Sequence, residues 1–140
     1  MVLRVLLSFL VLCGLGAVAF GGEALSVGTV LADPRAYHMQ EVTLHGTVRD
    51  VREMAPFRKG VLLCWGFYTF TLEDGTGAIE VFVQGPCTMN IMDPTVKPAQ
   101  VTEGDNITVE ASIFVGDYAS GEYNPDGKVT AMSKSFDRNP

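Results

Sequence analysis

The sequence is poor in the side chains on which catalysis usually depends. It has two histidines, three cysteines and one tryptophan, and charged residues make up only 19% of the 140 positions. It contains no Gly-x-Ser-x-Gly, His-Glu-x-x-His or glycine-rich phosphate-binding motif, and its carboxylates are scattered. Because nothing pairs a nucleophile with a base, or an acid with a base, we expect a protein that is not an enzyme and uses no cofactor.

The first twenty residues lack acidic side chains and contain a single base, Arg4. An apolar run over 5–15 follows, and Ala17 and Ala19 have the spacing of a small-residue cleavage site. This order is typical of a secretory signal peptide, and the run is short for a membrane-spanning helix. We predict a signal peptide at 1–19, a periplasmic or secreted location, and no stable membrane span after cleavage. Retention of this segment as an anchor is the alternative.

Basic residues are too few to favour binding through nucleic-acid phosphates alone. The chain has 10 Lys and Arg against 16 Asp and Glu, and cleavage removes only one charge, Arg4, so the net charge changes from −6 to −7. Nucleic-acid binders without sequence preference gain most of their affinity by neutralising phosphates. The apolar content of 47% argues against disorder, and the remaining length allows one domain, which we place at 24–137.

Alternating apolar and polar residues predict a protein made mostly of strands. Gly46 interrupts the first alternating segment and indicates a bulge or a bend at a barrel corner. A short helix is predicted over 26–33, with Ser26 as its cap and Asp33-Pro34 as its end. The expected strands are 41–53, 67–72, 78–83, 106–115 and 128–136, and the expected loops are 54–60, 88–101 and 116–127.

The second and third predicted strands form a hairpin whose register also concerns two cysteines. If Glu73 pairs with Ala78, then Leu72 faces Ile79, Phe70 faces Val81 and Tyr68 faces Val83. Apolar residues then oppose one another on one face, which favours this register. The same register places Cys64 opposite Cys87. Opposed residues in an antiparallel pair have about the separation that a disulfide needs, and an oxidising compartment favours the bond. We predict a Cys64–Cys87 disulfide, with two buried thiols in a chain that is not exported as the alternative.

The order of these elements resembles an OB-fold. The residues that carry the resemblance are VTLHGTVRDV, FTLEDGTGAIEVFV and VTEGDNITVEASI, and the preceding segment, SVGTVLADPRAYHMQEVTLHGTV, is similar to the lead-in of exported bacterial OB-fold modules of the tRNA-anticodon-binding type. The resemblance covers residues 26 to about 136. It implies an all-β protein, a five-stranded OB-type Greek-key barrel with a short N-terminal helix. Its motifs are structural and specify the fold better than the ligand.

The outer face of the first three strands is the predicted ligand-binding surface, because the OB-fold binds its ligands there. Its predicted residues are His45, Arg49, Trp65, Phe67 and Phe82. Aromatic rings beside cations suit the stacking of unpaired bases. The predicted function is an exported binding module for single-stranded nucleic acid or an oligonucleotide. The alternative is a periplasmic adaptor that binds a protein or an oligosaccharide through the same face, and the rings could also be covered by other parts of the chain.

Two further segments qualify this prediction. The 116–127 loop carries Tyr118 and Tyr123 together with Asp117, Glu122 and Asp126. If it closes over the face it should favour a neutral or cationic ligand, whereas a solvated connection would have no such effect. The soft ligands Cys87, Met89, Met92 and His38-Met39 suit Cu(I), but a disulfide would remove the thiolate and methionine also fills irregular gaps, so we expect no metal site.

Overall fold

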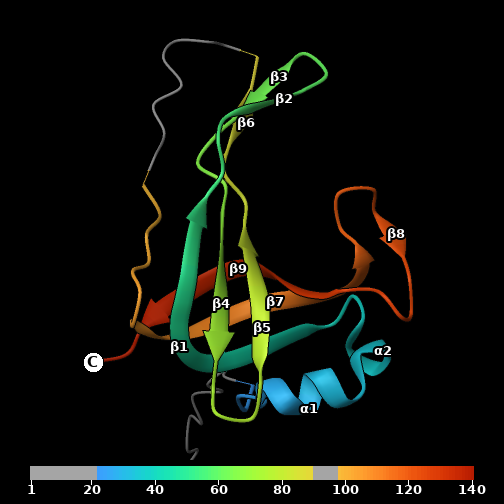
Figure 1. Cartoon of the computed structure of the whole chain (residues 1–140), viewed down its shortest axis with the longest axis vertical. Coiled ribbons are helices and arrows are strands. Elements are labelled where there is room, and N and C mark those ends of the chain that lie inside the picture. The colour runs from blue at the N-terminus through green and yellow to red at the C-terminus, as the bar shows by residue number, and fades with distance from the viewer. Residues whose placement is uncertain (1–21, 90–97) are drawn as a thin grey trace, which may run out of the picture.

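Five strands close into a barrel, as the alternating pattern predicts. In the computed structural model, which describes residues 22–89 and 98–140, the strand order is β1-β4-β5-β9-β7, and β7 pairs again with β1. Strand β5 runs parallel to β9, and the other pairs in the barrel are antiparallel. This arrangement is the Greek-key barrel of the OB-fold (Figure 1), so the predicted fold class is confirmed. The strands are β1 (Glu41–Glu53), β4 (Tyr68–Glu73), β5 (Ala78–Val83), β7 (Asn106–Asp117) and β9 (Val129–Arg138).

Strand β1 serves two neighbours and bends between them (Figure 1). Its first half pairs with β7 as far as Thr47, and its second half pairs with β4 from Thr47 onward. A Cβ atom on Gly46 would lie 2.5 Å from the carbonyl oxygen of Glu73, so only glycine fits this crossing. The bend predicted at Gly46 is therefore a barrel corner. The bulge lies slightly further on, where Asp50 adopts a φ of 55° between the two paired segments.

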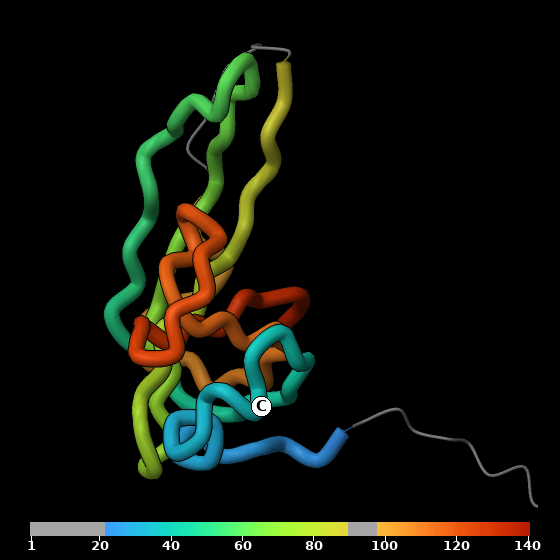
Figure 2. The backbone as a smooth tube through the Cα atoms, turned by 90° about the vertical axis from the view of Figure 1, so that its right-hand side faces the viewer, coloured from blue at the N-terminus to red at the C-terminus, as the bar shows by residue number. Residues whose placement is uncertain are grey.

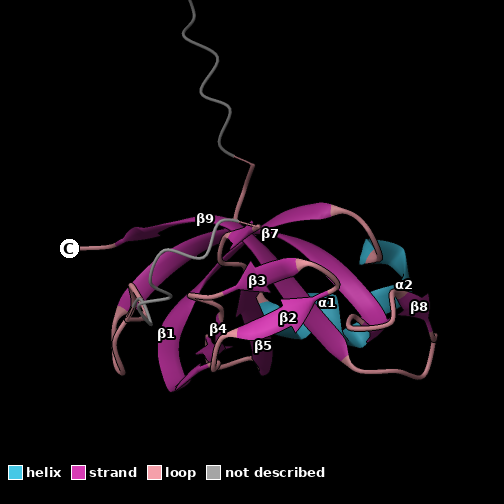
Figure 3. Cartoon of the chain, turned by 90° about the horizontal axis from the view of Figure 1, so that it is seen from above, coloured by secondary structure: helices cyan, strands magenta, loops and turns pink. Residues whose placement is uncertain are grey.

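The core consists of the inward-facing side chains of all five strands, and Figure 3 shows the strands curving around it. Helix α1 (Val27–Ala32) covers one end of the barrel and buries Val27 and Val30 completely. The Ser26 side chain caps it as predicted, accepting a hydrogen bond from the Thr29 N–H. A second short helix, α2 (Pro34–Tyr37), follows directly. Fully buried barrel residues include Leu44, Val48, Phe70, Leu72, Ile79, Val81, Ile107, Val109, Ile113 and Ala131.

Three short strands form an arm that projects from the barrel at the end opposite the helices (Figures 1 and 2). They are β2 (Phe57–Lys59), β3 (Leu62–Cys64) and β6 (Cys87–Thr88), in the order β2-β3-β6. The prediction of a loop over 54–60 was wrong for the three residues of β2. A three-residue strand with every side chain exposed has no alternation that would reveal it.

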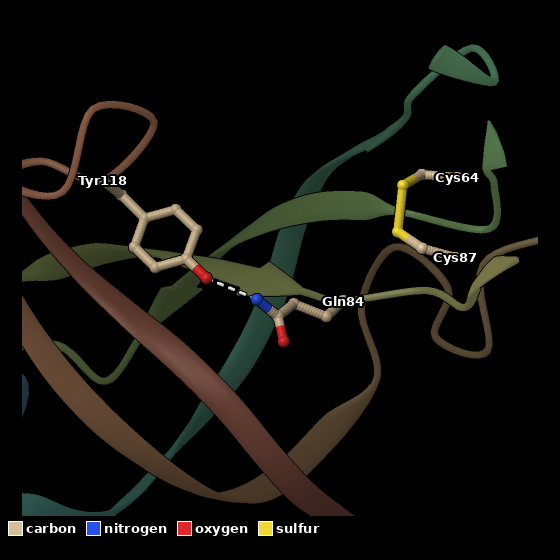
Figure 4. Close-up of a disulfide and its surroundings, with 4 residues drawn as sticks. All are labelled: Cys64, Gln84, Cys87 and Tyr118. Atoms are coloured by element: carbon tan, nitrogen blue, oxygen red, sulfur yellow. Dashed lines mark hydrogen bonds between the residues drawn. A yellow bond between two sulfur atoms is a disulfide. The ribbon is translucent and has the colours of Figure 1, made fainter. Parts of the chain in front are cut away.

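The arm continues the register of the β4–β5 hairpin. Tyr68 lies opposite Val83 in the hairpin, and Cys64 lies opposite Cys87 in the arm, so the predicted register holds over both. The predicted disulfide joins this cysteine pair (Figure 4). Between barrel and arm, a Cβ atom on Gly85 would lie only 1.9 Å from the Trp65 carbonyl oxygen. Glycine is therefore required where the segments that contain Trp65 and Gly85 cross at the base of the arm.

The predicted signal peptide at 1–19 lies outside the described residues, and so does 90–97 within the predicted 88–101 loop. Among the helices of the described residues, none is both long and apolar enough to cross a membrane.

Candidate functional site

A groove of about 580 Å³ lies between the outer face of the β4–β5 hairpin and the connection from β7 to β9. Thr69, Glu80 and Phe82 come from the hairpin, and Met54 lies at the base of the arm. The opposite wall comes from the connection and the strands that it joins, with Gly116, Asp117, Tyr118, Ala119, Asn124, Gly127, Lys128 and Thr130. We refer to this feature as the groove.

The connection from β7 to β9 folds back on the end of β7, which places it beside the groove. Within it, β8 (Glu122–Tyr123) pairs with β7, so that Gly116 lies opposite Tyr123. Gly116 has a φ of 132°, and a Cβ atom there would lie 2.1 Å from the Glu122 carbonyl oxygen. The close approach keeps Asp117 and Tyr118 at the groove. The 116–127 loop therefore borders the surface on which the sequence placed the ligand.

Seven rings form a continuous chain from the arm, past the groove, to helix α2. Neighbouring centroids in this ring chain lie between 4.5 and 5.8 Å apart, and no neighbouring pair is parallel. Tilted and edge-on contacts are favourable geometries for aromatic pairs. The two rings at the ends of this ring chain are exposed to solvent, Phe57 by 37% and Tyr123 by 49%. In order, the rings belong to Phe57, Phe67, Phe82, Tyr118, Phe114, His38 and Tyr123.

Tyr118 joins the two walls of the groove. Its ring packs against Phe82 at a centroid distance of 5.2 Å and a tilt of 47°. The side-chain amide of Gln84, just beyond β5, donates a hydrogen bond to the Tyr118 hydroxyl (Figure 4). Because the hydroxyl accepts in this bond, its own proton is left to donate to another group.

The charges around the groove are mainly negative. Among the described residues that line the groove, Lys128 is the one cation, and its ammonium lies 2.7 Å from a carboxylate oxygen of Glu80. Asp126 lies 3.5 Å from the Arg35 guanidinium across exposed side chains. Within residues 22–89 and 98–140, neither Asp117 nor Glu122 forms an ion pair with a basic side chain. The described lining therefore offers a phosphate no uncompensated cation, whereas the Asp117 carboxylate in the groove and that of Glu122 opposite it on β8 have no basic partner among the described residues.

Three of the predicted site residues lie along the hairpin and the base of the arm. Phe82 is half-buried and lines the groove. The ring centroids of Phe67 and Phe82 lie 5.8 Å apart, but Phe67 is only 8% exposed, so it packs against Phe82 without itself lining the groove. Trp65 lies between β3 and β4 and is half-buried, and its backbone N–H donates a hydrogen bond to the Pro86 carbonyl oxygen at 3.1 Å.

The other two predicted residues line a separate polar cleft of about 310 Å³. The Arg49 guanidinium lies 3.6 Å from Glu73 and 3.8 Å from Glu103, so its charge is already compensated. The His45 Nδ1 lies 3.0 Å from the side-chain nitrogen of Asn139. The predicted site is therefore divided between two places. His45 and Arg49 lie on β1, which borders β4 on the side away from β5, whereas the groove lies between the β4–β5 hairpin and the connection from β7 to β9.

Several residues of the groove escaped the sequence analysis. Gln84 follows the last residue of β5, and nothing in its surroundings in the sequence indicates a bond to Tyr118. Phe114 and His38 enter the ring chain from segments far apart along the chain. The outward position of Phe114 on β7 is the signal that could have indicated the first of them.

No metal centre is found among the described residues, where no group of three or more His, Cys, Asp or Glu side chains could hold an ion. Cys87 is held in the disulfide, and Met92 lies outside the described residues.

No family model and no curated protein matches the chain. Among solved structures, it is similar to a putative aspartyl-tRNA synthetase from Leishmania major Friedlin, with a TM-score of 0.52 and 11% identity over 86% of this chain and 22% of that chain. An asparaginyl-tRNA synthetase from Pyrococcus horikoshii matches with a TM-score of 0.49 and 16% identity over 83% of this chain and 23% of that one.

The second OB-fold domain of replication protein A from Methanococcus maripaludis matches with a TM-score of 0.48 and 12% identity over 72% of this chain and 85% of that chain. The chain spans less than a quarter of either synthetase. At 11% identity, the similarity to the Leishmania synthetase concerns the fold alone.

Proposed function

We propose that the protein is a non-enzymatic OB-fold binding module that acts in the periplasm or outside the cell and holds an extended ligand in the groove. The groove carries this proposal, because it lies on the face of the barrel where the OB-fold binds ligands and because the ring chain passes along it. A disulfide in a small domain with a predicted signal peptide supports an oxidising location.

The charge of the groove favours an uncharged or cationic ligand, which is a protein segment or an oligosaccharide. Lys128 is already paired with Glu80, and Asp117 repels anions. Aromatic side chains supply large contact areas at a small entropic cost, which suits binding of a polymer without strong charge.

Single-stranded nucleic acid is the second candidate, and the arm favours it. Arg58 and Lys59 follow Phe57 on β2, and no acidic residue occurs between positions 54 and 72. A nucleic-acid strand whose bases stacked on the rings of the groove and which continued to the arm would bring its phosphates near Arg58 and Lys59.

The dependence of binding on salt separates the two candidates. The mature protein should be titrated with a fluorescent oligothymidylate and with a chitin oligosaccharide, each at low and at high salt. Phosphate-driven binding weakens as salt rises, with a logarithmic slope of about −0.7 for each phosphate neutralised on a single strand. Replacing both Arg58 and Lys59 by Gln should then reduce the slope by about 1.4.

Groove binding of a neutral chain should instead change little with salt and be lost in Tyr118→Ala. The proposal of a binding module in the groove is wrong if Tyr118→Ala leaves every measured affinity unchanged, or if neither these probes nor the peptides described below bind.

A further inference from the structure

We infer that the ligand of the groove is an extended, proline-containing peptide that carries lysine or arginine. This inference rests on the proposed function and names the ligand class of the same site. Three features of the groove support it: the shape left between its rings, the hydrogen-bond donor that Tyr118 offers, and the carboxylates at its edge.

The two rings that line the groove form a notch rather than a flat open surface. Phe82 and Tyr118 lie 5.2 Å apart between centroids at an interplanar angle of 47°. A nucleic-acid base or a pyranose needs a broad ring face that is free to stack. Tilted neighbours instead leave narrow apolar notches, and the small rigid ring of proline suits them. Grooves lined by aromatic residues recognise proline-rich segments in this way.

The donor available in the groove suits an extended peptide. A polyproline II segment makes no internal hydrogen bonds, so its carbonyl oxygens point outward and need donors. The Tyr118 hydroxyl accepts from Gln84 and can donate its proton to such a carbonyl. Because proline restricts the free peptide to this conformation, little entropy is lost on binding.

The acidic edge of the groove selects a cation on the peptide. Asp117 lines the groove and lies opposite Glu122 in the β7–β8 ladder, so both side chains leave the same face of that ladder. Neither carboxylate forms an ion pair with a basic side chain among the described residues, so a lysine or arginine of the peptide would gain favourable charge interactions there. The charge complementarity excludes an acidic peptide and gives a reason to prefer a basic one.

The test is a calorimetric titration of the mature, oxidised protein with four short capped peptides. The first alternates proline with leucine and contains two arginines. In the others, the prolines are replaced by alanine, the arginines by glutamine, or the arginines by glutamate. The first peptide should bind most tightly, and each replacement should weaken binding by about tenfold or more, a loss expected for one charge-assisted contact or for lost preorganisation.

Variants of the protein locate the contact. Tyr118→Ala should abolish binding, and Tyr118→Phe, which keeps the ring, should weaken it several-fold. The double variant Asp117→Asn with Glu122→Gln should bind the arginine peptide and its glutamine form about equally. A matched control, Asp137→Asn with Glu110→Gln, removes the same charge from the β7 and β9 segments that lie roughly 20 Å along the strands from the groove. The control should bind as the unmodified protein does.

The outcomes separate this inference from the proposed function. If the peptides fail to bind but an oligosaccharide or oligothymidylate binds and is lost in Tyr118→Ala, the peptide inference is overturned and the binding module stands. Peptide binding that is indifferent to proline, to arginine or to the groove variants also overturns the inference. If no probe binds, both proposals fail.

Discussion

Asp74 shows how a single carboxylate ties two parts of the fold together. It lies in the turn between β4 and β5, and its Oδ2 accepts a hydrogen bond from the Val27 N–H, in the first turn of α1, at 2.7 Å. Its Oδ1 accepts from the N–H and the hydroxyl of Thr76. Partial burial raises the pKa of Asp74, but these hydrogen bonds outweigh that effect and hold the pKa below its ordinary value.

We predict that Asp74→Asn lowers the free energy of unfolding by about 1 kcal/mol at neutral pH, the usual net contribution of one intramolecular hydrogen bond. Because the pKa is lowered in the folded state, the carboxylate stabilises the protein above the pKa of the unfolded chain, near 4. That contribution is lost as the pH falls through the folded-state pKa. Urea unfolding at pH 7 and near pH 3 measures it.

The difference between the variant and the unmodified protein should shrink at the acidic pH. Glu23→Gln, at an exposed position before α1, is the control and should change neither curve. An equal loss at both pH values would show that Asp74 acts through its shape and not through its charge.

The elements that could be predicted from sequence are those with one buried face. Strand β4 alternates between buried and half-exposed residues along its length, and β1 and β7 do so over most of theirs, which the apolar pattern records directly. The two cysteines could be paired from sequence because the register predicted for the hairpin places Cys64 opposite Cys87, and the structure has them opposite each other. The arm was missed because its strands bury too little surface to impose a pattern.

The groove could be predicted only in part, for a related reason. Phe82 was expected on the outer face and lies there, and the acidic loop was expected as a possible border and is one. The positions of His45 and Arg49, by contrast, depend on how β1 packs against β4 and β7, and the structure places both residues in the polar cleft and not in the groove. Contacts such as Gln84 with Tyr118 are tertiary, and no local pattern encodes them.

The arm should behave as a separate unit of local stability. We predict that replacing Cys64 and Cys87 together by serine lowers the free energy of unfolding by about 3 kcal/mol, the chain-entropy value for a span of this length, 23 residues. Few buried contacts hold the arm otherwise, because only Leu63 and Cys64 are buried there.

Hydrogen exchange provides the measurement for this prediction. In the double serine variant the amides of β2, β3 and β6 should exchange rapidly, while those of β4, β5 and β7 remain protected. If exchange accelerates equally in the barrel, the arm and barrel unfold as one unit and the prediction is wrong.

The molecule as a whole has an uneven distribution of charge. The described arm carries Arg58 and Lys59 without an acidic side chain, whereas the 116–127 loop contains three carboxylates. Although the net charge of the protein is −6, the arm is therefore locally basic and the 116–127 loop is locally acidic. Encounters with a charged polymer should depend on which end it meets, and this dependence should decrease as salt screens the field.

The predicted location can be tested at the same scale. Expression of the whole chain in a bacterium, followed by fractionation and intact mass measurement, should recover a mature protein that begins at Phe20 in the periplasm or the medium. The two remaining cysteines should resist alkylation until a reductant is added. Recovery of a chain that retains Met1, or of free thiols, would contradict the predicted export.

If the protein is exported as we propose, the order of the disulfide within the chain has a consequence for how the protein folds during translocation. Both cysteines and the whole β4–β5 hairpin precede β7 and β9, whose pairing with β1 and β5 closes the barrel. A chain that leaves the membrane N-terminus first presents a complete, covalently fixed hairpin while the last strands are still behind it. The long-range closure then proceeds on a template whose register can no longer slip, which reduces the entropy lost in the slowest step.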